Sequence, residues 1–151
     1  MVVKSVIYYE KSMNEAAYSI SLLFLAGLTH EDIKTKELSI YKVVTFIFLG
    51  FLFRLATGQF TWNEISGCLF PGGVLLLLSF LTKERIGYGD GMTVAALGLW
   101  TGGWFTAFIV WIGIMLSGVW GGICLLRGKK EETIPFLPFL LLGMEVAFVY
   151  V

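Results

Sequence analysis

Charged residues are scarce in this chain of 151 residues: they make up 15% of the positions, and the 11 basic residues balance the 11 acidic ones. A formal net charge of zero provides no overall field that would attract nucleic acid, so no nucleic-acid partner is expected. The two cysteines, Cys68 and Cys124, each stand alone in an apolar run, and the chain has one histidine. This pattern argues against a disulfide framework and against a cluster of metal ligands. We therefore expect neither a metal nor another cofactor.

Apolar residues are abundant instead, because they form 57% of the sequence and lie in long runs rather than in amphipathic periods. Such runs are typical of helices that face lipid, so the sequence predicts an integral membrane protein. A helix needs about 20 residues to cross the hydrocarbon core of a bilayer, and about 17 can suffice. The candidate spans, the fourth of them short, are residues 13–29, 40–57, 64–82, 89–101, 104–126 and 134–151.

The fourth and fifth spans have to be separated within one uncharged run from Met92 to Leu126. As a single helix this run would be about 52 Å long, which exceeds the hydrocarbon thickness by more than tilt absorbs. A break is expected at residues 100–104, WTGGW, where threonine and glycine disfavour a helix and the two tryptophans suit an interfacial belt. The expected fold is all-α: one transmembrane domain over residues 1–151, built as a bundle of six transmembrane helices.

Basic residues are unevenly shared between the two faces of this expected bundle. The first, third and fifth loops share one face and hold eight of the eleven basic residues: Lys34, Lys36, Lys42, Lys83, Arg85, Arg127, Lys129 and Lys130. Because cytoplasmic loops carry an excess of Lys and Arg, these loops are expected in the cytoplasm and both termini outside. On the outer face, Arg54 and Glu64 flank a short loop, and both are expected to snorkel to the membrane surface.

Aspartate occurs only at positions 32 and 90, and each lies where an apolar span meets a cytoplasmic loop. Two carboxylates at one depth on one face can meet in a folded bundle, and they cannot both ionise cheaply when they share a site. The ionised carboxylate then takes a proton from water, while the neutral one protonates or hydrogen-bonds a peptide carbonyl. Asp32 and Asp90 therefore point to acid–base hydrolysis without a covalent intermediate.

Three glycines, Gly87, Gly89 and Gly91, surround Asp90 and are expected to let an extended substrate backbone come close to it. Each aspartate also has a plainer interpretation. Asp90 alone is typical of a helix cap, and Asp32 alone is typical of a solvated loop charge. The coincidence of face, depth and chemistry favours the pair.

Three segments of the chain resemble the type IV prepilin peptidases, a family of membrane aspartyl proteases with a GxGD motif. GYGD at residues 87–90 matches that motif, and DIKTKELSIYKVV at residues 32–44 is similar to the segment that begins with the family's first aspartate. KKEETIPFLPFLLLGMEVAF at residues 129–148 resembles the family's closing stretch. Two positions depart from the family pattern: Leu38-Ser39 stands where members often have Ile-Pro, and Met92 stands where many have lysine.

The resemblance implies an intramembrane aspartyl endopeptidase with Asp32 and Asp90 as catalytic residues. Its substrates would be prepilin or pseudopilin precursors, cut at the cytoplasmic face of a prokaryotic inner membrane to remove a short basic leader. Larger members carry an insert with paired CxxC motifs and N-methylating activity, and because this chain shows no such insert we expect peptidase activity alone. Acidic residues in the cytoplasmic loops are candidates to contact the leader: Glu31, Glu37, Glu84, Glu131 and Glu132.

Two other functions stay open on the residues themselves. A small proton-coupled carrier would use Asp32 and Asp90 as relay groups and the broken fourth span as its gate, although the chain shows no internal repeat. A catalytically inactive bundle would serve as an assembly scaffold. Apart from these functions, the patterns Gly98-x-x-x-Gly102 and Gly118-x-x-x-Gly122 predict close helix packing.

Overall fold

The computed structural model describes residues 2–35, 38–58, 61–81, 87–128 and 135–150. These residues form helices and no strand, so the all-α prediction is confirmed. Two of the described helices, α3 and α5, are long and apolar enough to cross a membrane, and residues 137–149 form a shorter apolar helix. The helices are α1 (Val2–Thr35), α2 (Ile40–Ala56), α3 (Trp62–Leu81), α4 (Tyr88–Thr101), α5 (Gly103–Leu126) and α6 (Leu137–Tyr150).

The second to sixth helices lie close to the expected spans, but the first is much longer than expected. α1 begins at Val2, whereas the apolar run begins at residue 13. The preceding segment carries Lys4, Glu10 and Lys11, which interrupt an apolar pattern but are good helix formers. α1 therefore extends well beyond its apolar run.

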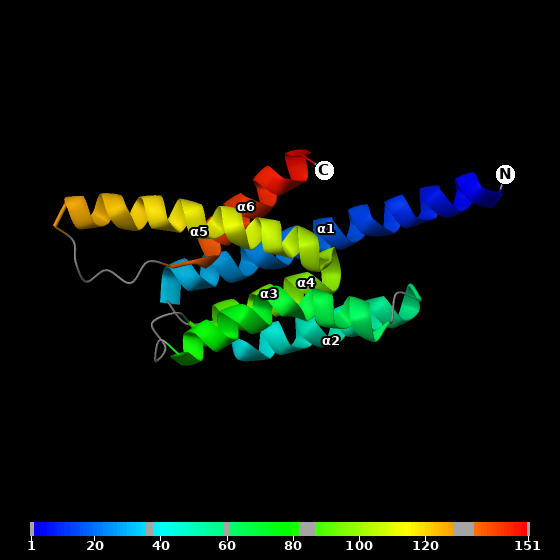
Figure 1. Ribbon diagram of the computed structural model, residues 1–151, viewed down its shortest axis with the longest axis horizontal. Helices are drawn as coiled ribbons and strands as arrows, with labels where there is room; N and C mark the ends of the chain where they lie inside the picture. Colours follow the sequence, from blue (N-terminus) through cyan, green and yellow to red (C-terminus); the bar gives the residue numbers. More distant parts are fainter. Residues whose placement is uncertain (1, 36–37, 59–60, 82–86, 129–134, 151) are drawn as a thin grey trace.

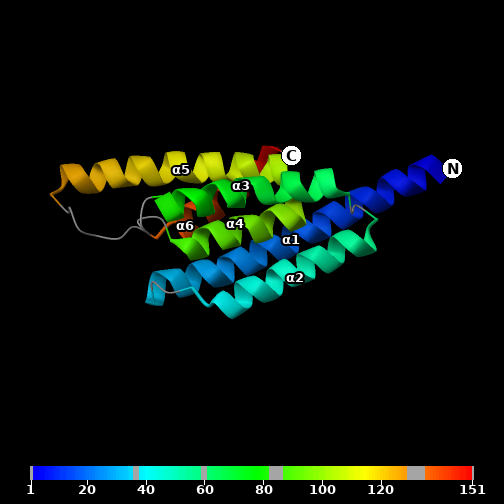
Figure 2. The same cartoon turned by 60° about the horizontal axis from the view of Figure 1, so that its bottom comes forward.

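Consecutive helices run in opposite directions along the bundle (Figure 1, Figure 2). The C-terminal ends of α1, α3 and α5 consequently lie at the same end as the N-terminal ends of α2, α4 and α6. We call this end, at the left in Figure 1, the aspartate end, because α1 finishes just after Asp32 and α4 begins just before Asp90. Both chain termini lie toward the opposite end.

α4 is the central helix of the bundle, in contact with α1, α2, α3 and α5. Every residue from Thr93 to Thr101 is buried, which is the behaviour of a helix that is apolar on all sides. A Cβ atom added at Gly98 would run into the carbonyl oxygen of Cys68 on α3, so the absence of a side chain allows the two backbones to touch. The prediction of close packing is thus confirmed at Gly98.

The second glycine pattern does not produce helix packing. A Cβ atom at Gly118 or Gly122 would meet no atom within 4 Å in the part of the chain that the structure describes. Both glycines lie on an outward face of α5, where residues 118–120 are exposed. The prediction of a packing contact is wrong for this pair, because spacing alone does not say which face of a helix meets a neighbour.

The break between α4 and α5 lies at Gly102, as expected. Its backbone angles, φ +91° and ψ 151°, fall in a region that essentially only glycine adopts. Of the two tryptophans assigned to an interfacial belt, Trp104 is exposed, but Trp100 is buried and the assignment is wrong for it. The Trp100 indole Nε1 donates a hydrogen bond to the Phe46 carbonyl oxygen at 3.1 Å, and the ring stacks on Phe46 and Phe53. Burial of Trp100 therefore leaves no unpaired side-chain donor, because its single N–H group is hydrogen-bonded.

Candidate active site

Asp32 lies on the core-facing side of α1. The buried positions of this helix recur every three or four residues and so form one stripe: Ala17, Ser21, Leu25, Leu28, Thr29 and Asp32. Asp32 is only 8% exposed. The interpretation of this residue as a solvated loop charge is therefore wrong, since its position in the helical period turns it toward the bundle.

Two opposing influences act on the Asp32 carboxyl, which lies three residues beyond the end of the expected first span. Burial raises the pKa of Asp32, and a hydrogen bond donated by the backbone N–H of Leu137 partly offsets this by lowering it. Leu137 is the first residue of α6, so the N-terminus of that helix helps to hold the carboxyl. The Asp32 Oδ2 atom is buried and has no hydrogen-bond partner among the residues that the structure describes.

Asp90 lies in the first turn of α4, three residues after the N-cap Gly87. Its backbone N–H donates to the Gly87 carbonyl oxygen at 3.2 Å, and the helix N-terminus favours a carboxylate at this position. The Asp90 side chain is partly buried, and its carboxyl interacts electrostatically with that of Asp32. The structure thus brings together two carboxyls that are far apart in the sequence, at one end of one bundle.

The motif glycines contribute mainly by permitting close packing. A Cβ at Gly89 would lie 2.5 Å from Cδ1 of Leu38, and one at Gly91 would lie 2.8 Å from Cγ of Leu76. Their space is therefore filled by the protein itself and not left open for a substrate. Gly87 differs, because a Cβ there would lie 3.2 Å from Oδ2 of Asp90. Of the three glycines, Gly87 is the one that keeps side-chain atoms away from the Asp90 carboxyl.

Among the acidic residues proposed as leader contacts, Glu31 is described and half-buried. Its carboxylate forms an ion pair with the ammonium of Lys42 at the start of α2. A basic ligand would therefore compete with Lys42 for this carboxylate. The other four candidates, Glu37, Glu84, Glu131 and Glu132, lie outside the described residues.

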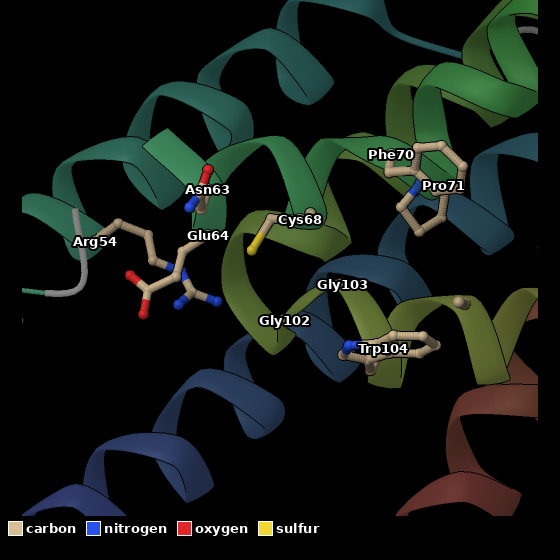
Figure 3. Close-up of a pocket in the computed structure, with 11 residues that line it drawn as sticks. Arg54, Asn63, Glu64, Cys68, Phe70, Pro71, Gly102, Gly103 and Trp104 are labelled. Carbon is tan, nitrogen blue, oxygen red and sulfur yellow. The ribbon is translucent and has the colours of Figure 1, made fainter. Parts of the chain in front are cut away.

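A cavity of about 690 Å³ lies at the end of the bundle opposite the aspartates, between α2, α3 and the junction of α4 with α5 (Figure 3). Both Arg54 and Glu64 line it. Arg54 is only 9% exposed, and its Nε donates to the Leu99 carbonyl oxygen at 2.7 Å. The snorkelling prediction is wrong for Arg54, because the carbonyl groups in the last turn of α4 lack helical partners and the guanidinium satisfies one of them.

Two contributors to the aspartate end were not predicted from the sequence. One is the Leu137 amide described above. The other is Thr29, which lies one helical turn before Asp32, is 6% exposed, and has an Oγ1 atom without a hydrogen-bond partner among the described residues. The spacing of Thr29 and Asp32 was visible in the sequence, but burial of both side chains was not. Within the described ranges, no group of three or more His, Cys, Asp and Glu side chains is arranged to hold a metal ion.

Comparison with known proteins gives one family and several relatives. The sequence profile of the type IV leader peptidase family matches residues 19–126, a range that includes Asp32 and Asp90. The chain is 31% identical over 137 residues to the prepilin leader peptidase/N-methyltransferase of Pectobacterium carotovorum subsp. carotovorum, across 82% of this chain and 47% of that protein.

Proteins with the same name from two further organisms show similar likeness. Identity is 38% over 96 residues with the protein of Stutzerimonas stutzeri, across 59% of this chain and 32% of the relative. It is 29% over 135 residues with the protein of Escherichia coli (strain K12), across 84% of this chain and 60% of the relative. The chain therefore spans between 32% and 60% of the length of these three relatives. No solved structure gives a significant match.

Proposed function

Because the chain belongs to the type IV leader peptidase family, we propose that it is an intramembrane aspartyl endopeptidase whose catalytic residues are Asp32 and Asp90. The observation that carries this proposal is the pairing of two carboxyls at one end of the bundle, one of them on a core-facing position with an oxygen that lacks a partner among the described residues. A buried carboxyl with an unsatisfied oxygen is costly for a structural residue. Such a group is typical of a site that binds and transfers protons.

The proposed reaction uses the two carboxyls as one acid–base unit. With one ionised and one protonated, the ionised carboxylate takes a proton from a water molecule whose oxygen attacks the carbonyl carbon of the scissile peptide bond. The protonated carboxyl donates to the carbonyl oxygen. As the tetrahedral intermediate collapses, the C–N bond breaks and the leaving amine takes a proton from the pair. Because the two groups are coupled, the pair titrates as a unit and neither aspartate is assigned one fixed role.

We extend the proposal to the membrane and the substrate. The six helices would form one six-span domain with the aspartate end in the cytoplasm of the inner membrane. Three features support this: the alternating helix directions, the excess of basic residues in the loops at the aspartate end, and the family itself. The substrate would be a prepilin or pseudopilin precursor, whose basic leader is attracted by the acidic residues of these loops.

One observation favours a peptidase over a proton-coupled carrier. A carrier needs a polar route between the aspartates and the opposite end of the bundle, where the cavity containing Arg54 lies. Between these two regions the described core of α4 is apolar from Val94 to Trp100. Among the residues whose side chains the structure describes, those that line the cavity come from α2, α3, α5 and the turn at Gly102, and not from α1.

The proposal is tested by co-expression of this chain with a prepilin that carries an uncleaved basic leader. Asp32→Asn and Asp90→Asn are each expected to lower the cleavage rate by at least about 100-fold, because each removes one proton-transferring group. Glu64→Gln is the matched control, since it makes the same chemical change on an exposed residue at the opposite end and should cleave normally. Immunoblotting of precursor and product, with membrane levels of each variant, provides the measurement. Normal cleavage by either Asn variant, or no cleavage by the wild type, overturns the proposal.

A further inference from the structure

Two buried side-chain atoms lack a hydrogen-bond partner within the described part of the structure, and both lie at the aspartate end. They are Oγ1 of Thr29 and Oδ2 of Asp32. The two residues are one turn apart on the same face of α1, and each is more than nine-tenths buried. Buried polar atoms of folded proteins nearly always have partners, so two exceptions in neighbouring positions call for a common explanation.

Thr29 behaves differently from other buried hydroxyl residues in this bundle. A serine or threonine inside a helix usually donates back to the carbonyl oxygen four residues earlier. Ser21 does so to Ala17 at 2.7 Å, and Thr93 does so to Gly89 at 2.8 Å. The Thr29 hydroxyl makes no such bond among the described residues, so both its donor and its acceptor capacity are left for a partner other than these residues.

The chemistry of the two atoms selects that partner. A carboxylate oxygen only accepts hydrogen bonds, whereas a hydroxyl both donates and accepts. A carbonyl group would be repelled by the Asp32 oxygen, and a metal ion would need more ligands than one carboxylate and one hydroxyl. A water molecule satisfies both atoms, because it can donate one hydrogen to Asp32 Oδ2 and form its second hydrogen bond with Thr29 Oγ1.

We propose that Thr29 is a positioning residue that, together with Asp32, holds and orients the water molecule that attacks the scissile peptide bond. This inference rests on the proposed function. The bond to Asp32 directs one water proton into the Asp32–Asp90 pair, and the bond to Thr29 fixes the rotation of the molecule. The water oxygen then forms the new bond to the carbonyl carbon, the C–N bond breaks, and the leaving amine takes its proton from the pair.

The experiment compares kcat and KM of the purified full chain for a full-length prepilin precursor in detergent. Thr29→Val replaces the hydroxyl with a methyl group of similar size, and it is expected to lower kcat by about 10- to 100-fold with unchanged KM, because only the orientation of the water is lost. Thr29→Ser restores the hydroxyl and should recover most of the wild-type kcat. The melting temperature of Thr29→Val should stay close to that of the wild type, since no hydrogen bond to another described residue is lost.

Thr101 offers a matched control for the same substitution. It is the last residue of α4 and lies at the end of the bundle opposite the aspartates. Its hydroxyl is also buried, but it donates to the Leu97 carbonyl oxygen at 2.9 Å and lies 2.8 Å from the Thr106 hydroxyl. Thr101→Val leaves Thr106 without this partner, so the melting temperature should fall while kcat stays unchanged. The two valine variants are thus expected to show opposite patterns.

The outcomes distinguish failure of the Thr29 inference from failure of the proposed function. If the wild type cleaves the precursor and Thr29→Val keeps the wild-type kcat, the inference is overturned and the proposed function stands. The inference also fails if Thr29→Ser is as impaired as Thr29→Val, because then the shape of the side chain and not its hydroxyl is required. If the wild type itself cleaves nothing, or if Asp32→Asn retains activity, the proposed function fails first.

Discussion

At the scale of single residues, the buried carboxyl of Asp32 lowers the stability of the folded protein when it is ionised. Asp32 lies outside the expected spans on a core-facing position of α1, and burial raises its pKa above the ordinary value for aspartate. Such a carboxyl binds its proton more tightly in the folded protein than in the unfolded chain. Its contribution to the free energy of unfolding is fully present below the unfolded pKa of about 3.9, and it is lost as the pH rises through the folded pKa.

Asp32→Asn should therefore raise the melting temperature at neutral pH, because the amide resembles the protonated carboxyl and still accepts a bond from the Leu137 N–H. It should also flatten the decline in melting temperature as the pH rises above the unfolded pKa of about 3.9. Thermal unfolding of the purified protein in detergent measures both effects. Glu64→Gln removes the same charge from an exposed position and should give no comparable gain. A variant Asp32→Asn with the wild-type pH dependence would show that the buried carboxyl does not limit stability.

The sequence predicts part of this site and not the rest, for a physical reason. Asp32 and Asp90 are visible because aspartate occurs only at these two positions, and the order of the spans places both at one end. Leu137 and Thr29 are not visible, because their roles depend on where α6 begins relative to α1 and on which face of α1 is buried. Those are properties of tertiary packing, and no local pattern encodes them.

At the scale of the helices, glycine decides how closely α3 and α4 approach. Gly98 touches the backbone of α3, whereas Gly118 on α5 has open space around it in the described structure. Gly98→Ala should destabilise the protein by about 1–3 kcal/mol, because the two helices must move apart. Gly118→Ala should be neutral or stabilise α5 by up to about 1 kcal/mol through helix propensity. Unfolding free energies measured in detergent test the pair, and equal effects of the two substitutions would contradict the packing described for α4.

Except in α1, helix boundaries follow the apolar runs well, whereas the burial of single side chains follows them poorly. The break at Gly102 is set by local chemistry, since glycine accepts backbone angles that other residues avoid, and it was predicted. Trp100 and Arg54 look like residues of a membrane interface in the sequence. In the structure each is buried and donates a hydrogen bond to a carbonyl oxygen on another helix. The tryptophan donates to Phe46 and the arginine to Leu99. Such partners come from segments distant in the sequence.

At the scale of the whole molecule, the alternation of helices separates two ends that proposed membrane insertion would place on opposite sides. Tyr41 and Trp62 are exposed aromatic residues in the first turns of α2 and α3, one at each end of the bundle. In a chain with Cys68 and Cys124 replaced by alanine, a membrane-impermeant maleimide added to cells whose inner membrane is intact should label Trp62→Cys. Tyr41→Cys should react only after the membrane is opened. The reverse pattern would invert the proposed orientation, and equal labelling of both sites would contradict a crossing by α2.

The central position of α4 also has a consequence for how the protein is made. This helix has 14 residues, so it is about 21 Å long, less than the hydrocarbon thickness of about 30 Å, and its sides are covered by other helices. Among the described helices, α3 and α5 are long and apolar enough to cross a membrane, and they precede and follow α4 in the chain. In the proposed membrane arrangement, these flanking helices would enter the lipid before α4 takes its place between them. The proposed catalytic pair would thus form only once the whole bundle has assembled, because the helix with Asp90 is covered by helices that precede and follow it in the chain.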